Sequence, residues 1–295
     1  MSSPVLPAGM LVRHWPSHYH ARSNSHFQVE LFMATVGTIA ECLEQFAPST
    51  LAADWDNVGL LVGDRAAPVE RVMTCLTITP ETVAEAIDGR AQMIVTHHPL
   101  PFQALKTITA DTTVGSMLLK LITARIAVYS PHTAFDSARA GINQHLAIGL
   151  GLQEITPLIV PFAEEPDVGV GRCGILGEQF TLEDLVERVK NFLGLSRVQV
   201  VGCDGQIVAR VAIACGSGGA LVPMAIENGC HCLVTGETNY HTCLEAAARG
   251  VALVLTGHFA SERFALLSLA DYLSDLLAGV TVWASRMEQD PVRRM

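Results

Sequence analysis

Three short segments of the sequence bring together histidine and carboxylate side chains that could bind metal ions. They are residues 96–99 (THHP), 131–136 (PHTAFD) and 256–263 (TGHFASER). Each follows an apolar run that is typical of a buried β-strand. Ligands of open α/β sheets bind beyond the carboxyl ends of the strands, so the three segments are expected to serve one region.

The segment 256–263 carries the strongest signal. If a helix begins near Gly257, His258 and Glu262 lie one turn apart on the same face. This spacing suits two ligands that converge on a metal, and a helical glutamate can bridge two ions through its two oxygens. The alternative is a solvated helix face, but a histidine directly after an apolar strand is not typical of a surface position.

The other two segments are weaker when each is taken alone. Adjacent residues of an extended chain point to opposite sides, so His97 and His98 would serve two neighbouring ions. One of them could instead be structural, or the segment could be a simple turn. Asp136 could equally be a turn or helix cap, and His132 a hydrogen-bonded loop residue. The recurrence of such residues at three strand ends is what favours a shared site.

The ligand types indicate the class of metal. Mixed imidazole and carboxylate ligands suit Zn, Fe, Mn, Co or Ni, and ligands shared by two ions leave positions open for water. A second group of potential zinc ligands contains no CxxC pair, and buried structural cysteines are its favoured interpretation. That group consists of Cys230, Cys232, Cys243, His231 and His241.

The elements that must position these residues alternate along the chain. Helical spacing runs from Val36 to Phe46, and Thr79 with Pro80 predicts the start of a second helix. Strand and helix patterns then alternate to the end of the chain, and the strand ends QMIVTHH, CLVTGE and ALVLTGH resemble one another. We therefore predict two related α/β domains with mainly parallel sheets flanked by helices, with the metal site in the cleft between them.

Domain boundaries follow from composition. Residues 1–32 show no periodicity and are expected to form a flexible tail, so their histidines are discounted as ligands. The first domain is placed at residues 33–160 and the second at residues 161–295, with residues 256–262 returning to the metal site. The junction is marked by Pro157, Pro161 and Pro166.

Composition excludes several classes of protein. With 49% hydrophobic and 16% charged residues, the chain can bury a large core and is not a disordered protein. The net charge of −10 disfavours nucleic acid as a partner, although bound metal ions could still attract a small anion. The sequence shows neither a membrane-spanning run nor a signal peptide, which predicts a cytoplasmic protein.

Six segments together resemble the signatures of the NIF-three-like (YbgI/YqfO) family, whose members are often named GTP cyclohydrolase 1 type 2 homologues. The segments are WDNVGLLVGD, THHP, PHTAFD, GVGRCG, TGETNYH and TGHFASE, and the resemblance runs from about Met33 to the C-terminus. It implies a ring-shaped homohexamer with two divalent metal ions per chain. The ligands that it implies are His97, His98, Asp136, His258 and Glu262.

We assign His97 and Asp136 to one ion and His98 and His258 to the other. His132, Glu237 and His241 are expected near the metals without binding them, where they would orient water or substrate. The favoured function is metal-dependent hydrolysis of a small nucleotide-like or phosphate-bearing substrate, with GTP ring opening as the named candidate. The alternative is a metal-binding chaperone or regulatory adaptor without turnover. A nucleic-acid-binding ring is disfavoured by the acidic charge.

Overall fold

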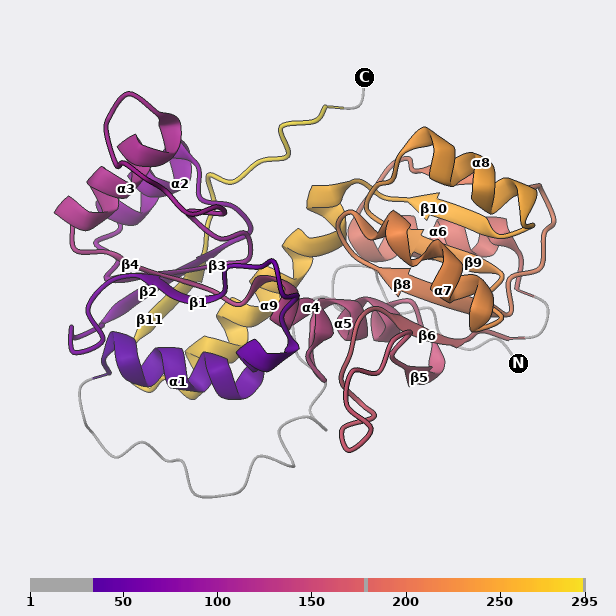
Figure 1. Cartoon of the computed structure of the whole chain (residues 1–295), viewed down its shortest axis with the longest axis horizontal. Coiled ribbons are helices and arrows are strands. Elements are labelled where there is room, and N and C mark those ends of the chain that lie inside the picture. Colours follow the sequence, from indigo (N-terminus) through magenta and orange to yellow (C-terminus); the bar gives the residue numbers. More distant parts are fainter. Residues whose placement is uncertain (1–33, 178–179, 294–295) are drawn as a thin grey trace. The chain divides into compact units, whose positions relative to one another are not determined.

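The computed structural model describes residues 34–177 and 180–293, which form two compact units (Figure 1). The first unit contains the described residues up to Ala138 together with those from Ala265 onward, and the second contains Arg139–Phe264. Each unit has its own sheet and helices, as the sequence predicted. The tail expected at residues 1–32 lies outside the described residues.

The first unit is built on a five-stranded sheet with the order β1-β4-β3-β2-β11. The strands are β1 (Gly59–Val62), β2 (Arg71–Cys75), β3 (Met93–Thr96), β4 (Ala127–Ser130) and β11 (Thr281–Ala284). All neighbours are parallel except β1 and β4. The helices are α1 (Val36–Phe46), α2 (Pro80–Asp88), α3 (Thr113–Thr123), α4 (His132–Ser137) and the C-terminal part of α9 (His258–Leu276), with a short 3-10 turn at Ser49–Leu51.

The helices of this unit begin where local chemistry predicts. Thr35 caps α1 and Thr79 caps α2, each accepting a hydrogen bond from the third helical residue, and Pro80 occupies the first position of α2. In α1, Ile39 and Leu43 are buried. Figure 1 shows α2 and α3 on one face of the sheet and α1 on the other, so both faces of its apolar central strands are covered.

The second unit is built on a six-stranded sheet with the order β5-β6-β8-β9-β10-β7. Its strands are β5 (Gln153–Thr156), β6 (Arg172–Ile175), β7 (Gln199–Val201), β8 (Arg210–Ala214), β9 (Cys232–Thr235) and β10 (Ala252–Leu255). Its helices are α5 (Ile142–Gly149), α6 (Leu182–Leu193), α7 (Val222–Glu227), α8 (Tyr240–Ala248) and the start of α9, with a 3-10 turn at Gly218–Leu221.

The expectation of a mainly parallel sheet is wrong for the second unit. Only β8, β9 and β10 are parallel neighbours among its described strands, and the other three pairings are antiparallel. The outer strands β5 and β7 are short and largely exposed. Exposed edge strands lack the apolar run by which a buried strand is recognised, so the sequence pattern did not reveal them.

The two units also divide at other positions than the junction expected at residues 160–161. Helix α5 packs against β6 and β8, which places residues 139–160 in the second unit. The proline-rich stretch is a loop inside that unit, where Ile159 and Val170 form an antiparallel bridge. Strand β11 pairs in parallel with β2, so the C-terminal residues return to the first unit.

His145 of α5 gives the second unit a predicted sensitivity to acid. Its ring is buried beside the rings of Phe192 and Phe264, and burial lowers its pKa to about 4. In the unfolded chain His145 becomes protonated as the pH falls below 6.5, whereas in the folded chain it becomes protonated only near pH 4. The free energy of unfolding should therefore fall across this window, by on the order of 3 kcal/mol.

Urea unfolding of wild type and His145→Leu at pH 7.5 and pH 4.5 measures this effect. We expect the variant to lose less stability than wild type between the two pH values. His241→Ala, which removes an exposed histidine, is the control and should behave like wild type. An equal loss in wild type and His145→Leu would contradict the prediction.

Within the described residues, no helix combines the length and the apolar character that crossing a membrane requires.

Candidate metal centre

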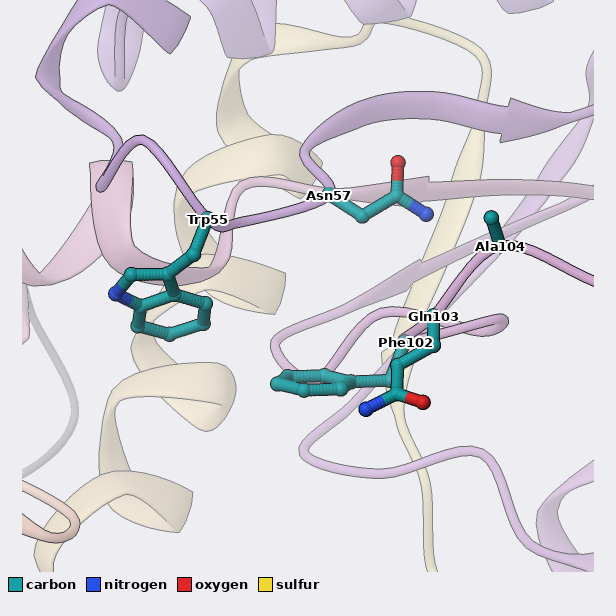
Figure 2. A pocket seen from close by; sticks show the side chains of 5 residues that line it. All are labelled: Trp55, Asn57, Phe102, Gln103 and Ala104. Carbon is teal, nitrogen blue, oxygen red and sulfur yellow. The ribbon is translucent and has the colours of Figure 1, made fainter.

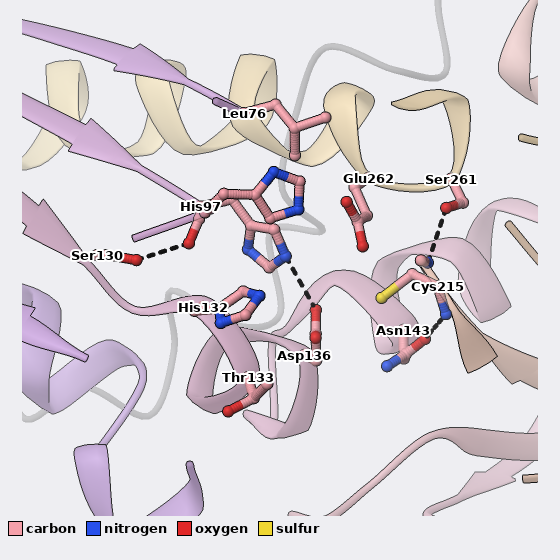
Figure 3. A network of polar contacts seen from close by, with 12 residues as sticks. Leu76, His97, Ser130, His132, Thr133, Asp136, Asn143, Cys215, Ser261 and Glu262 are labelled. Atoms are coloured by element: carbon pink, nitrogen blue, oxygen red, sulfur yellow. Dashed lines mark hydrogen bonds and ion pairs between the residues drawn. The ribbon is translucent and has the colours of Figure 1, made fainter. Parts of the chain in front are cut away.

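His97 and His98 lie directly after β3, and backbone hydrogen bonds hold them in place. The amide of His97 donates to the carbonyl of Cys75 (3.1 Å), and that of His98 donates to the carbonyl of Leu76 (2.8 Å). The hydroxyl of Ser130 donates to the carbonyl of His97 (2.6 Å; Figure 3). These bonds tie the segment to both neighbouring strands, so the two imidazoles project from a rigid sheet edge.

The segment 131–136 is a helical turn and not the loop that the sequence suggested. Because α4 begins directly after β4, His132 and Asp136 lie one turn apart, and Asp136 Oδ1 lies 3.7 Å from His97 Nε2. One ligand atom each of His97, His98 and His132 lies within 4.8 Å of the other two. Nitrogen ligands at about 2.1 Å from one ion are roughly 3.4 Å apart in a tetrahedral site, so these groups could be drawn onto a metal.

Asp56 fixes the orientation of His132. Its Oδ1 lies 2.7 Å from His132 Nδ1, and its other oxygen accepts hydrogen bonds from the amide and hydroxyl of Thr133. Burial would raise the pKa of Asp56, but the hydrogen bonds from His132 and Thr133 lower it to about 2. The ionised carboxylate thus favours a proton on Nδ1, which leaves Nε2 as the electron-pair donor.

His98 is held in a similar way by a hydroxyl. Thr77 Oγ1 lies 2.7 Å from His98 Nδ1. When Nδ1 carries the proton and donates to Thr77, Nε2 is the nitrogen that can bind a metal. Partners of this kind on the second ring nitrogen are characteristic of histidines that bind metals.

The second unit contributes His258 and Glu262 from the first turns of α9. They lie at positions i and i+4, as the sequence predicted, and His258 Nε2 is 3.2 Å from Glu262 Oε2. The Glu262 side chain is almost fully buried and that of His258 is about one-third exposed. On the other side of the ring, Glu237 Oε1 lies 2.9 Å from His258 Nδ1.

The carboxylates of Glu237 and Glu262 stabilise positive charge at His258. In the metal-free protein the hydrogen bond with Glu262 raises the pKa of His258, burial opposes this, and Glu237 raises it further, to about 9. A divalent cation can be stabilised by the same two negative charges, in which case it replaces the proton.

Glycine residues make room for this pair. Gly216 has a φ of +60°, and a Cβ built on it would lie 2.2 Å from Glu262 Oε1. A Cβ on Gly236 would lie 2.7 Å from Ser261 Oγ and 3.0 Å from the Cα of His258. Ser261 accepts a hydrogen bond from the amide of Gly216 and donates to the carbonyl of His258, which joins the glycine turn to α9.

The remaining candidates are placed as follows. His241 is exposed on α8, where its ring contacts Tyr240 edge-on, and it joins neither group of candidate ligands in the described part of the chain. The cysteine group around His231 forms no metal-binding cluster within residues 34–177 and 180–293, and Cys230 and Cys232 are buried.

Sequence reasoning assigned no role to Asp56, Thr77, Gly216 or Ser261. Asp56 lies within the WDNVGLLVGD motif, and its position in that motif could have marked it as a candidate site residue. The partnership with His132, 76 residues away, exists only in the folded unit. Gly216 lies in a glycine-rich turn directly after β8, at the same sheet edge as the strand ends that carry Glu237 and His258.

Glu237 and His241 should respond differently to replacement. Glu237→Ala removes the partner of His258 Nδ1, and we expect about tenfold weaker metal affinity with nearly intact metal content at saturation. His241→Ala should leave both quantities unchanged because its ring is exposed and belongs to neither group of possible ligands among the described residues. Competition with a chromophoric chelator measures both affinities. Loss of a full metal equivalent in Glu237→Ala would instead make Glu237 a ligand.

The donor types in both units suit metal binding. The first unit gathers three imidazoles and a carboxylate, and the second gathers an imidazole and a buried carboxylate. Imidazole nitrogen and carboxylate oxygen are donors that suit a transition-metal ion. Carboxylate and hydroxyl groups that contact the other ring nitrogen of the histidines are typical of such sites.

Comparison with known proteins identifies relatives across most of the chain. Residues 34–291 match the Duf34/NIF3 (NGG1p interacting factor 3) family. A protein of Clostridium acetobutylicum named GTP cyclohydrolase 1 type 2 homolog is 36% identical over 227 residues, which are 77% of this chain and 85% of the relative. The protein of Helicobacter pylori strain J99 named GTP cyclohydrolase 1 type 2 is 31% identical, covering 85% of this chain and 96% of that one.

Solved structures agree with these matches. A hypothetical protein of Staphylococcus aureus superposes with a TM-score of 0.80 at 27% identity, covering 90% of this chain and all of the other. A Bacillus cereus protein related to NIF3 superposes with a TM-score of 0.82 at 24% identity, covering 90% of this chain and all of that one, and supports the fold. By sequence and by fold, this chain is a member of the Duf34/NIF3 family.

Proposed function

We propose that this protein binds two divalent metal ions and hydrolyses a small nucleotide-like or phosphate-bearing substrate. The proposed ligands are His97, His98, Asp136, His258 and Glu262. The observation that carries the proposal is that two of the histidines have a hydrogen-bond partner on Nδ1. Thr77 lies within hydrogen-bond distance of His98 Nδ1, and Glu237 lies within hydrogen-bond distance of His258 Nδ1. In each ring, Nε2 is then the nitrogen that can bind a metal.

The residues of the chain have distinct tasks in this proposal. The Asp56 carboxylate holds the ring of His132 beside those of His97 and His98, where it can orient water or substrate. Glu262 supplies negative charge that allows cations to bind in a buried place. Divalent ions bound there would supply Lewis acidity and a hydroxide nucleophile at neutral pH.

Hydrolytic opening of the guanine ring of GTP is the first candidate reaction. It is supported by the names of relatives, which include GTP cyclohydrolase 1 type 2 of Helicobacter pylori. The reaction consumes water at a carbon between two nitrogens, and such a hydrolysis needs an activated water and stabilisation of the negative charge that develops on oxygen.

We further propose that the protein acts in the cytoplasm as a ring-shaped homohexamer. Sedimentation velocity should give about six times the 31.6 kDa mass of the chain. A stable monomer or dimer at micromolar concentration would contradict this assembly.

The function is tested by elemental analysis of protein purified without added metal, followed by a screen of nucleotides and phosphoesters. Two metal equivalents and hydrolysis of at least one nucleotide support the proposal. His97→Ala should lose metal and activity together while the assembly survives. Metal binding and assembly without turnover of any substrate would instead indicate a metal-binding chaperone or regulatory adaptor.

A further inference from the structure

A pocket of about 500 Å³ opens in the first unit (Figure 2). Its lining residues are Trp55, Asn57, Phe102, Gln103 and Ala104. The side chains of Trp55 and Phe102 are 65% and 51% exposed, and their ring centroids are 6.0 Å apart. Large aromatic side chains gathered on a surface commonly mark a binding site.

Two segments of the chain build this pocket. In the first, Asp56 points to His132 while its neighbours Trp55 and Asn57 line the pocket. The second is the stretch 97–112 between β3 and α3, which begins with the candidate ligands and continues with Phe102. The side-chain amide of Asn57 donates to the carbonyl of Pro101 (2.7 Å) and joins the two segments. Connections this long are commonly functional.

The pocket reaches the candidate metal centre through His132. The ring of His132 lies edge-on to Trp55 and to Phe102, with centroids 6.0 Å apart in both cases. The same ring lies 5.0 Å from that of His97 and 5.6 Å from that of His98. A molecule that rests on the two aromatic side chains would therefore be adjacent to the candidate metal ligands His97 and His98.

The lining residues indicate what such a molecule would be. None of the five is charged, so this pocket suits a neutral ring better than a phosphate group. Indole and phenyl rings stack well on planar heterocycles, and amides such as those of Asn57 and Gln103 match the mixed donors and acceptors on the edge of a nucleobase. The volume also falls within the range of small-molecule sites.

We propose that this pocket binds the purine base of a nucleotide substrate by stacking on Trp55 and Phe102. The inference rests on the proposed function, because it places the substrate ring beside the candidate metal ligands. It adds the residues that would hold the purine ring, which the proposed function leaves unassigned.

Binding to metal-free protein tests the pocket separately from the metal chemistry. Calorimetric titration of chelator-treated protein should show that GMP and guanosine bind with similar affinity and that ribose 5-phosphate binds at least tenfold more weakly. Trp55→Ala and Phe102→Ala should each weaken GMP binding about tenfold or more. The matched control is Phe162→Ala, which removes an exposed aromatic side chain of the second unit and should bind GMP as wild type does.

Trp55→Phe keeps an aromatic ring and should retain most of the affinity, while the quenching of tryptophan fluorescence by GMP should largely disappear. Wild-type affinity for GMP in both alanine variants would overturn the inference, whatever their metal content. A change of sedimentation coefficient in these variants with unchanged GMP affinity would also overturn it and identify a subunit contact. GMP binding that depends on the pocket, in a protein that never hydrolyses a nucleotide, would overturn the proposed function alone.

Discussion

Glu262→Gln is expected to lose at least one metal equivalent and all hydrolytic activity. The substitution keeps the shape of the side chain but removes a negative charge from an almost fully buried position 3.2 Å from His258. Without that charge, a divalent cation would have to be desolvated with one fewer anionic ligand. The core strands do not depend on this side chain, so the fold should persist.

Metal analysis by mass spectrometry and circular dichroism measure the two parts of this prediction. Glu245→Gln, which makes the same change at an exposed position of α8, is the matched control and should keep wild-type metal content. If Glu262→Gln binds two equivalents with wild-type affinity and turns over at the wild-type rate, Glu262 is not a ligand and the proposed site is wrong.

Asp56→Asn should weaken metal binding by about tenfold, because Asp56 orients His132, whose ring packs against the rings of the proposed ligands His97 and His98. The asparagine retains an acceptor, but the charge that fixes the proton of His132 on Nδ1 is lost. The His132 ring can then adopt the other tautomer or rotate away from Asp56. Because it packs against the ring of His97, that ring would also be less well held in place.

Thr133→Val provides the control for a merely structural effect. It removes the hydroxyl that donates to Asp56 but leaves the contact between Asp56 and His132. We expect this variant to lose stability to urea while it keeps wild-type metal affinity. If Asp56→Asn and Thr133→Val both lower stability and neither changes the metal dissociation constant, Asp56 does not act on the metal site by orienting His132.

Local patterns were sufficient to predict most of the elements that carry candidate ligands. The apolar runs of β3, β4 and β10 and the spacing of His258 and Glu262 follow from residues close together in the chain. The caps at Thr79 and Pro80 are equally local. Such features depend on backbone geometry and burial, which recur every two residues in strands and every three to four in helices.

Features formed by distant residues could not be derived in this way. The pairing of β11 with β2 decides that the C-terminal residues belong to the first unit, and the antiparallel pairing of β6 with β8, together with those of β5 and β7, makes the second sheet mixed. None of these pairings leaves a signal within its own segment, because the partner strand lies far away in the sequence.

The candidate site shows the same division between local and distant information. The sequence alone determined which imidazoles and carboxylates stand at strand ends, because ligand chemistry is a property of residue type and of position in an element. The tertiary structure alone decided that Asp56 holds His132, that Gly216 makes room for Glu262, and that Trp55 meets Phe102. The physical reason is that hydrogen bonds, close approaches and stacking depend on atomic positions, and these are defined only when segments distant in sequence pack together.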